Sequence, residues 1–187
     1  MIDFIKENKE TLPYVKEDYL SFLNEEPTLR NWYGYSIQFD GLYTNKNKIQ
    51  KLQSVLNHFI NQFNEDQHWL IRHDDKFLPW FIEGDEKRLP KLKRVFNNKQ
   101  VPFNFKGSIL FSSDELLEVS DEVVSYSYLL SYKNLDIINV DTCILFKCTN
   151  HLTLDVISTE KILILSMRKY AEKLGYPVIN YRNSPIV

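Results

Sequence analysis

The longest amphipathic pattern in the chain lies between residues 46 and 64. Its apolar residues recur three or four positions apart, at Ile49, Leu52, Leu56, Phe59, Ile60 and Phe63. This spacing places them along one face of an α-helix. A second pattern of this kind covers residues 159–174, with Glu160 in its first turn and Gly175 directly after its end. An acid at the start of a helix and a glycine after its end are typical of helix termini, so two long helices are predicted.

Alternation of apolar and polar residues predicts strands elsewhere in the chain. The ranges with this period are 32–40, 68–73, 77–82, 123–132, 135–140, 143–148 and 152–157. Pro79 restricts the range that contains it to the edge of a sheet. Because the last ranges follow one another closely, an antiparallel C-terminal meander is expected. The residues Ser112 and Glu115 match a capping box, which predicts a helix of two or three turns starting there.

The predicted fold class is therefore α+β, with a mixed or antiparallel sheet that packs against the two long helices. The first thirty residues hold two short helical patterns, 3–11 and 16–24, and we interpret residues 1–30 as a helical cap or arm. No internal repeat or linker composition divides the chain. We expect residues 1–187 to form one domain.

Charge argues against nucleic acid or lipid as a partner. The chain has 23 Lys and Arg against 25 Asp and Glu, a formal net charge of −2, so binding of this kind needs a local basic patch. The candidate patch consists of Lys87, Arg88, Lys91, Lys93 and Arg94. We interpret it as a solvated connector, so nucleic acid is not an expected partner.

The sequence also favours a cytoplasmic location. It has no apolar stretch of eighteen residues and no secretory signal at its start, so no membrane association is expected. Cys143 and Cys148 lie five positions apart in a predicted strand and point to opposite faces, away from a mutual disulfide. Free thiols are typical of a reducing compartment.

Common cofactor motifs are absent from the sequence. The glycines at 34, 41, 84, 107 and 175 are too scattered for a Walker loop or a dinucleotide-binding turn. There is no Gly-x-Ser-x-Gly and no paired-cysteine zinc spacing. No cofactor and no metal is expected, although an enzyme whose site is assembled from distant residues is not excluded.

Functional groups are most concentrated between residues 68 and 80, which hold half of the histidines and two of the three tryptophans. The candidates for chemistry or binding are His68, Trp69, Arg72, His73, Asp74, Asp75 and Trp80. In the functional interpretation the imidazoles and carboxylates act as bases or ligands, and the indoles form the walls of a pocket. In the structural interpretation the tryptophans are core residues and the two aspartates form a turn. Since His68 and Arg72 share a strand face, they are candidates to bind an anion together.

Two further groups are candidates. His151, Thr153 and Asp155 alternate with apolar residues and are expected to line one strand face, with Asp136 or Asp141 on an adjoining strand as a further acid. The tyrosines form the other group. Tyr126, Tyr128 and Tyr132 share one face of the predicted strand 123–132, where they either cover a core or form a protein-binding surface.

The leading functional hypothesis is a small cytosolic binding module that docks another protein, such as an inhibitor or immunity-type protein of a bacterial cell. Compact size, mild acidity and abundant Tyr and Trp favour this hypothesis. The alternative is a metal-assisted or acid/base hydrolase. In that case His68, His73 or His151 converges in one cleft with a carboxylate of Asp74, Asp75 or Asp155.

Overall fold

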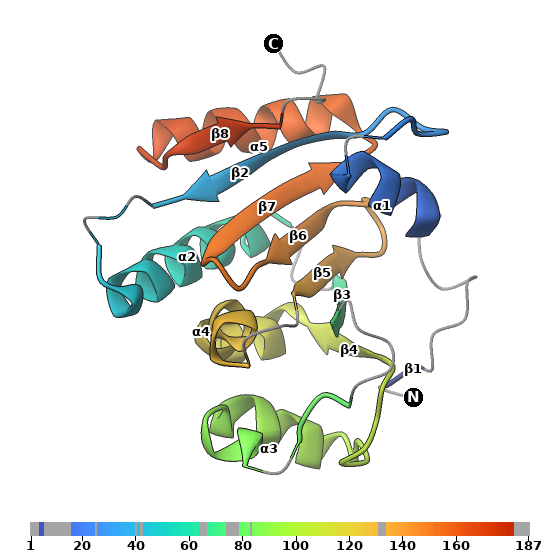
Figure 1. The fold of residues 1–187 in the computed structure, drawn as a ribbon, viewed down its shortest axis with the longest axis vertical. Coiled ribbons are helices and arrows are strands. Elements are labelled where there is room, and N and C mark those ends of the chain that lie inside the picture. Colours follow the sequence, from blue (N-terminus) through green and yellow to red (C-terminus); the bar gives the residue numbers. More distant parts are fainter. Residues whose placement is uncertain are drawn as a thin grey trace.

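The computed structural model describes residues 4–5, 16–24, 26–39, 41, 43–63, 67–73, 79–82, 84–130 and 134–181. These residues form an α+β fold around one eight-stranded sheet with the order β1-β4-β3-β5-β6-β7-β2-β8 (Figure 1). The strands are β1 (Phe4–Ile5), β2 (Tyr33–Gln38), β3 (His68–His73), β4 (Ser108–Ser112), β5 (Leu135–Asn139), β6 (Leu145–Cys148), β7 (Thr153–Ser158) and β8 (Val178–Asn180). Every neighbouring pair is antiparallel. The predicted α+β class is confirmed, and β5, β6 and β7 form the expected meander.

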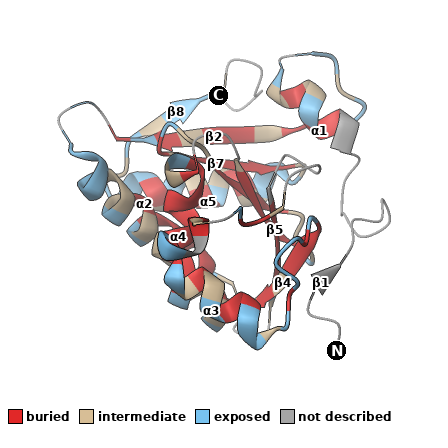
Figure 2. Cartoon of the chain, turned by 60° about the horizontal axis from the view of Figure 1, so that its bottom comes forward, coloured by how far each residue is buried: buried red, intermediate tan, exposed pale blue. Residues whose placement is uncertain are grey.

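The helices are α1 (Lys16–Leu23), α2 (Asn45–Ile60), α3 (Pro90–Asn98), α4 (Ser113–Leu129) and α5 (Lys161–Lys173), with a short 3₁₀ turn η2 (Asp85–Lys87). The two predicted long helices are α2 and α5. Their apolar faces pack on one face of the sheet together with α4, and Figure 2 shows the buried residues of α2 and α4 turned inward. At the centre, Phe146 of β6 lies between Phe59 and Trp69, with ring centroids 5.6 and 5.7 Å away.

The capping box at the start of α4 is confirmed, but the helix is much longer than predicted. The Ser112 side chain accepts from the Glu115 N–H at 3.2 Å, and the Glu115 carboxylate accepts from the Ser112 N–H at 2.9 Å. From there α4 continues for 17 residues. The prediction of a strand over 123–132 is therefore wrong as far as residue 130. Of the serines that suggested period two, Ser125 donates to the helix carbonyl of Asp121 at 2.7 Å, and Ser127 donates to the carbonyl of Cys148 in β6 at 3.0 Å.

The opposite face of the sheet is covered by α1. Tyr19 and Phe22 of this helix pack with Trp32 and with four sheet residues, Leu70, Ile138, Leu145 and Ile157. Helix α1 thus covers part of this sheet face, whereas the sequence pattern of residues 1–30 left a cap and an arm as alternatives. The first predicted helix, 3–11, lies mostly outside the described residues, and its described part is the edge strand β1 rather than helix.

Two other predicted strands differ from the structure. The range 143–148 is strand only from Leu145, because Cys143 has a positive φ of 54° in the turn after β5. Of the range 77–82, residues 79–82 are described and form no strand. The Trp80 side chain is nevertheless fixed, since its indole N–H donates to the carbonyl of Gly107 at 2.8 Å.

Candidate functional site

A row of charged side chains crosses the sheet face that α1 covers. Arg72 of β3 lies opposite Asp136 of β5, Asp136 lies opposite Lys147 of β6, and Lys147 lies opposite Asp155 of β7. Ser36 of β2 follows, opposite Asp155. Side chains that face each other across antiparallel strands are close neighbours, so the order of the strands produces alternating positive and negative charges. We call these five residues the charged row.

The four charged residues of the row are buried, and Asp136 pairs with both cations. Asp136 is 1% exposed and accepts from Arg72 Nε and Nη2 at 3.2 and 3.1 Å and from Lys147 Nζ at 3.0 Å. The Tyr19 hydroxyl of α1 lies 3.4 Å from the same carboxylate. At the next carboxylate, the Ser36 hydroxyl donates to Asp155. The polar interior of this face is therefore held together by its own residues.

The two carboxylates of the row differ in pKa. Burial would raise the pKa of Asp136, but the neighbouring Lys147 and Arg72 charges outweigh burial and lower it. Burial does raise the pKa of Asp155, and hydrogen bonds from Ser36 and Tyr181 only partly offset it. Perturbed groups of this kind occur at functional sites and also in structural ion-pair networks. The contacts described above are all made within the chain, which favours a structural role for the row.

The predicted pairing of His68 with Arg72 does not form an anion site in the described residues. Both side chains belong to the same face of β3, but four residues along a strand span about 13 Å. His68 is exposed, whereas Arg72 is buried against Asp136. Trp69 and Trp80 are also buried, at 0% and 1% exposure, in agreement with the structural interpretation. Asp74, Asp75 and the side chain of His73 lie outside the described residues.

The structure places His68 and His151 at opposite ends of the sheet. His68 begins β3, opposite Ser112 of β4. His151 is exposed in the turn after β6, and β6 ends at Cys148, level with the other end of β3. Thr153 bonds the Thr149 hydroxyl at 2.8 Å, and Asp155 belongs to the charged row. Among the described residues, no group of three His, Cys, Asp or Glu is arranged to hold a metal ion.

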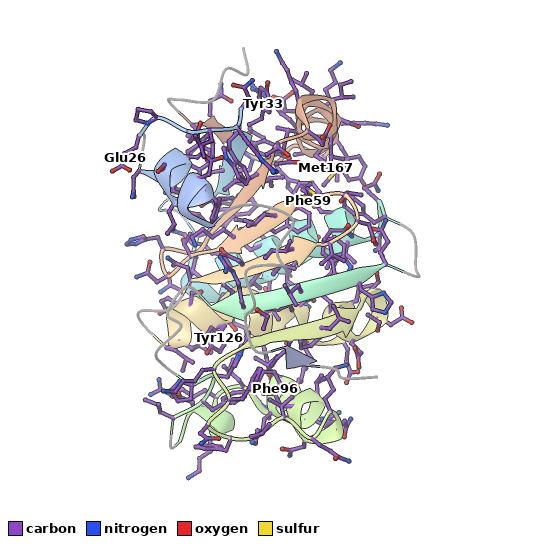
Figure 3. All side chains as sticks on the ribbon, turned by 90° about the vertical axis from the view of Figure 1, so that its right-hand side faces the viewer. Glu26, Tyr33, Phe59, Phe96, Tyr126 and Met167 are labelled. Carbon is purple, nitrogen blue, oxygen red and sulfur yellow. The ribbon has the colours of Figure 1, made fainter. Side chains whose placement is uncertain are left out.

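The tyrosines predicted to share one strand face lie on a helix instead. Tyr126 is fully buried in α4, where its hydroxyl donates to the Trp80 carbonyl at 2.6 Å, and it lies in the same lower part of the molecule as Phe96 (Figure 3). Tyr128 is 38% exposed and its hydroxyl accepts from Asn45 at 2.8 Å. Tyr132 lies outside the described residues. No exposed tyrosine ladder is present in the described part of α4.

Two cations of the candidate basic patch, Lys91 and Arg94, and Lys99 beyond it pair with acids of α4. Lys91 pairs with Asp121 at 2.7 Å, Arg94 with Glu118 at 3.8 Å and Lys99 with Glu115 at 2.8 Å. The remaining cations include Arg88, which donates to the Leu129 carbonyl, and Lys93, which lies 5.1 Å from the Phe103 ring centroid. Lys87 is exposed. These contacts support the interpretation of this segment as a charged connector.

The end of the sheet where β5 ends and α5 begins carries an open hollow of about 610 Å³. It is lined by Asp141, Thr142, Cys143, Glu160, Ile162, Leu163 and Ser166. Most of the lining surface is apolar, and Ile162 in the first turn of α5 is 84% exposed. Burial raises the pKa of the Cys143 thiol, with the Glu160 charge adding to the effect, so this cysteine is not an activated nucleophile.

A loop with a second exposed aliphatic residue lies at the same end. Leu29, between α1 and β2, is 91% exposed. Because Tyr33 of β2 pairs with Ser158 of β7, the loop lies beside the connection from β7 to α5. Lys161 Nζ lies 5.9 Å from the Tyr33 ring centroid, and Tyr33 appears near α5 in Figure 3. We call the hollow together with Leu29 the apical surface.

The buried carboxylate of Asp18 holds this loop in place. It accepts from the Leu29 N–H, from the Arg30 N–H at 3.1 Å and from the Trp32 indole at 2.9 Å. Burial opposes ionisation of Asp18, but these hydrogen bonds outweigh it and lower the pKa of the carboxyl. The contacts of Asp18 thus fix the backbone of the loop that carries the exposed Leu29. No sequence pattern predicted these contacts.

Comparisons with known proteins found no similar protein. No protein family model matches the chain, no curated protein matches it, and no solved structure matches its fold. Within the described residues, no helix is long and apolar enough to cross a membrane.

Proposed function

We propose that this protein is a binding module that docks another protein on its apical surface. The observation that carries the proposal is the exposure of two large aliphatic side chains, Leu29 and Ile162, beside an open and mostly apolar hollow. Isolated exposed apolar residues are common on protein surfaces. A group of them next to a concavity is typical of an interaction site.

The chemistry of the remaining polar groups supports binding rather than catalysis. In the charged row Asp136 is paired with Arg72 and Lys147. His68 and His151 lie at opposite ends of the sheet, and His58 bonds the Tyr176 hydroxyl at 2.6 Å. The pKa of both thiols is raised, for Cys148 mainly by burial. A general base or nucleophile needs an accessible group with an activated pKa. A docking surface needs apolar area and a rigid frame, and the Asp18 contacts to the Leu29 loop supply such a frame.

The proposed setting is the cytoplasm, and the proposed role is that of an inhibitor or immunity-type protein. The free Cys143 and Cys148 thiols are compatible with a reducing compartment. In this role the module acts by covering a surface of its partner, and it needs no cofactor.

The test is affinity capture from the cell of origin with wild type and two variants. Ile162→Lys places a charge in the hollow without removing core contacts, because the wild-type side chain is largely exposed. Ile179→Lys is the matched control, since Ile179 of β8 is also exposed, at 48%, but does not line the hollow. Both variants are checked by circular dichroism.

The expected result is one stoichiometric protein that wild type and Ile179→Lys retain and Ile162→Lys loses. The captured protein is then purified, and its affinity for the three proteins is measured by calorimetry. We expect Ile162→Lys to weaken binding by at least about 10-fold, since losing a buried aliphatic side chain costs about 1.5–3 kcal/mol. Equal retention by all three proteins, or no stoichiometric partner at all, would contradict the proposal.

A further inference from the structure

We infer that ionisation of Asp155 opens a lid, formed by α1 together with Tyr181, over the charged row. Tyr181 is the residue directly after β8. The inference concerns a conformational change within the chain and needs no partner. Because Asp18 of α1 holds the Leu29 loop, an open lid also releases that loop. Only this last consequence, the control of the apical surface, rests on the proposed function.

Two contacts join the lid to the charged row. At one of them, the Tyr19 hydroxyl of α1 lies 3.4 Å from the Asp136 carboxylate. At the other, the Tyr181 hydroxyl donates to Asp155. The Tyr181 ring also packs on Phe22 of α1, with ring centroids 5.5 Å apart. Asp155 is therefore connected to α1 through the side chain of Tyr181.

The charge of Asp155 is poorly compensated while the lid is closed. Asp155 is 7% exposed and accepts from two neutral hydroxyls, those of Ser36 and Tyr181. It forms no ion pair within the described part of the chain. Lys147 lies opposite Asp155 in the register, but its Nζ lies 3.0 Å from Asp136 and pairs there. A buried carboxylate with only neutral donors is less stable in its charged form than the same group in water.

The charges that surround Asp155 do not remove this cost. Lys147 of β6 favours ionisation of Asp155, whereas Asp136 of β5 opposes it, and burial outweighs the favourable contributions, so the pKa of Asp155 is raised. Burial also raises the pKa of the Tyr181 hydroxyl, which therefore stays a donor. Among the described residues, the titratable side chains of this sheet face and its lid are Arg72 of β3, Asp136 of β5, Lys147 of β6, Asp155 of β7, Tyr181 after β8 and Tyr19 of α1.

The effect of pH on the lid follows from the two environments of Asp155. In the open form water reaches the carboxyl, and its pKa returns towards the ordinary value of about 3.9. The closed form, with the raised pKa, is fully favoured below that value and is weakened as the pH rises through the closed-form pKa. Within this interval each pH unit makes opening up to about 10-fold more frequent. Above the interval the carboxyl is ionised in both forms, so opening no longer changes with its titration.

The experiment is hydrogen exchange of the purified full chain from about pH 4 to about pH 9, read by mass spectrometry as protection relative to an unfolded peptide at the same pH. Protection of the α1 amides is expected to fall by up to about 10-fold per pH unit within the interval. The amides of α2 lie in the core on the other face of the sheet and should keep their protection. In Asp155→Asn, protection of α1 relative to α2 should no longer change with pH.

Two further variants separate this effect from a general loss of stability. Asp141→Asn removes an exposed carboxylate and should behave as wild type. Tyr181→Phe keeps the ring on Phe22 and removes one donor to Asp155, so the closed-form pKa should rise and the interval should extend to higher pH. This variant also tests the inference if Asp155→Asn does not fold. Carbon NMR of the Asp155 carboxyl measures its pKa directly in wild type.

Two results would overturn the inference. One is a pKa of Asp155 at or below about 3.9 in the native protein. The other is protection of α1 that varies with pH equally in wild type and in Asp155→Asn. Because no partner takes part in these measurements, such a result leaves the proposed function standing. Conversely, a failure of Ile162→Lys to lose a captured protein contradicts the proposed function and leaves the lid standing.

Discussion

Asp136 is the residue on which the charged row depends most. It is 1% exposed and is the shared counter-ion of Arg72 and Lys147, which are 2% and 7% exposed. Asp136→Asn preserves the size of the side chain and removes its charge, so two buried cations lose their partner at once. Removing one partner of a buried ion pair costs about 3–5 kcal/mol, and because two cations are affected we expect a value near the upper end of that range. Domains of this kind have a total stability of about 5–15 kcal/mol.

The same row provides a matched control. Asp155 is also buried, but its pKa is raised, so folding disfavours the ionised form of this carboxyl relative to the unfolded chain. Asp155→Asn removes that unfavourable charge, so it should destabilise the protein less than Asp136→Asn does, by less than about 1 kcal/mol. The assay is urea unfolding followed by tryptophan fluorescence, since Trp32, Trp69 and Trp80 are all buried.

The pH dependence of the two variants has opposite signs. The lowered pKa of Asp136 contributes stability that is present above its unfolded pKa of about 3.9 and is lost as the pH falls through its folded pKa. The loss of stability that Asp136→Asn causes relative to wild type should therefore become smaller at acidic pH. The raised pKa of Asp155 contributes stability below its unfolded pKa that is lost as the pH rises through its folded pKa. The stability of Asp155→Asn relative to wild type should therefore increase as the pH rises. A cost for Asp136→Asn below about 1 kcal/mol, or equal costs for both variants, would refute this account of the row.

Three other measurements probe local features. Gly34→Ala should destabilise the fold by about 1–3 kcal/mol, because a Cβ at this position would lie 3.0 Å from a backbone oxygen of the neighbouring strand β7. Gly41→Ala is the control and should leave the stability almost unchanged, because a Cβ there has no atom within 4 Å. A lower melting temperature for Gly41→Ala than for Gly34→Ala would contradict the packing of β2 on β7. Ser112→Ala should cost about 1 kcal/mol in chemical unfolding through loss of the α4 cap, and no change would mean that the capping box adds no stability. In the native protein a thiol reagent should modify Cys143 slowly and leave Cys148 unmodified, because burial raises the pKa of the Cys148 thiol more strongly than that of Cys143. Modification is measured by mass spectrometry. Faster modification of Cys148 than of Cys143 would disprove the burial of Cys148 in β6.

Local sequence patterns predicted the elements well wherever one pattern covered a whole element. The period of Leu52, Leu56 and Phe59 predicted α2. The alternation in 68–73 predicted β3 with Trp69 and Ile71 in the core, but the other face of the strand, with Leu70 and Arg72, is buried as well. The pattern was misleading in 123–132, where tyrosines and serines alternate for a few residues. There the capping box at Ser112 and the packing of α4 on α2 and the sheet determined the outcome. Short-range alternation was too weak a signal against those tertiary contacts.

The charged row had a sequence signal that a search for clusters missed. Arg72, Asp136, Lys147 and Asp155 are each a single charge in a mostly apolar strand, and their signs alternate in the order in which the strands pair. That order is not encoded in any local pattern, so the row became visible only with the register. The apical surface had no signal at all, because the exposure of Leu29 and Ile162 depends on how the loop and α5 lie relative to the sheet.

The most direct test of the docking role is a photo-crosslinking amino acid placed at position 162 in cells that normally produce the chain. Irradiation is expected to give a discrete adduct with a partner protein, while the same amino acid at position 179 gives none. Ile162 and Ile179 are both exposed, so surface position alone does not distinguish them. Equal adducts from both positions, or none from position 162, would contradict the assignment of the apical surface as the place where this protein binds its partner.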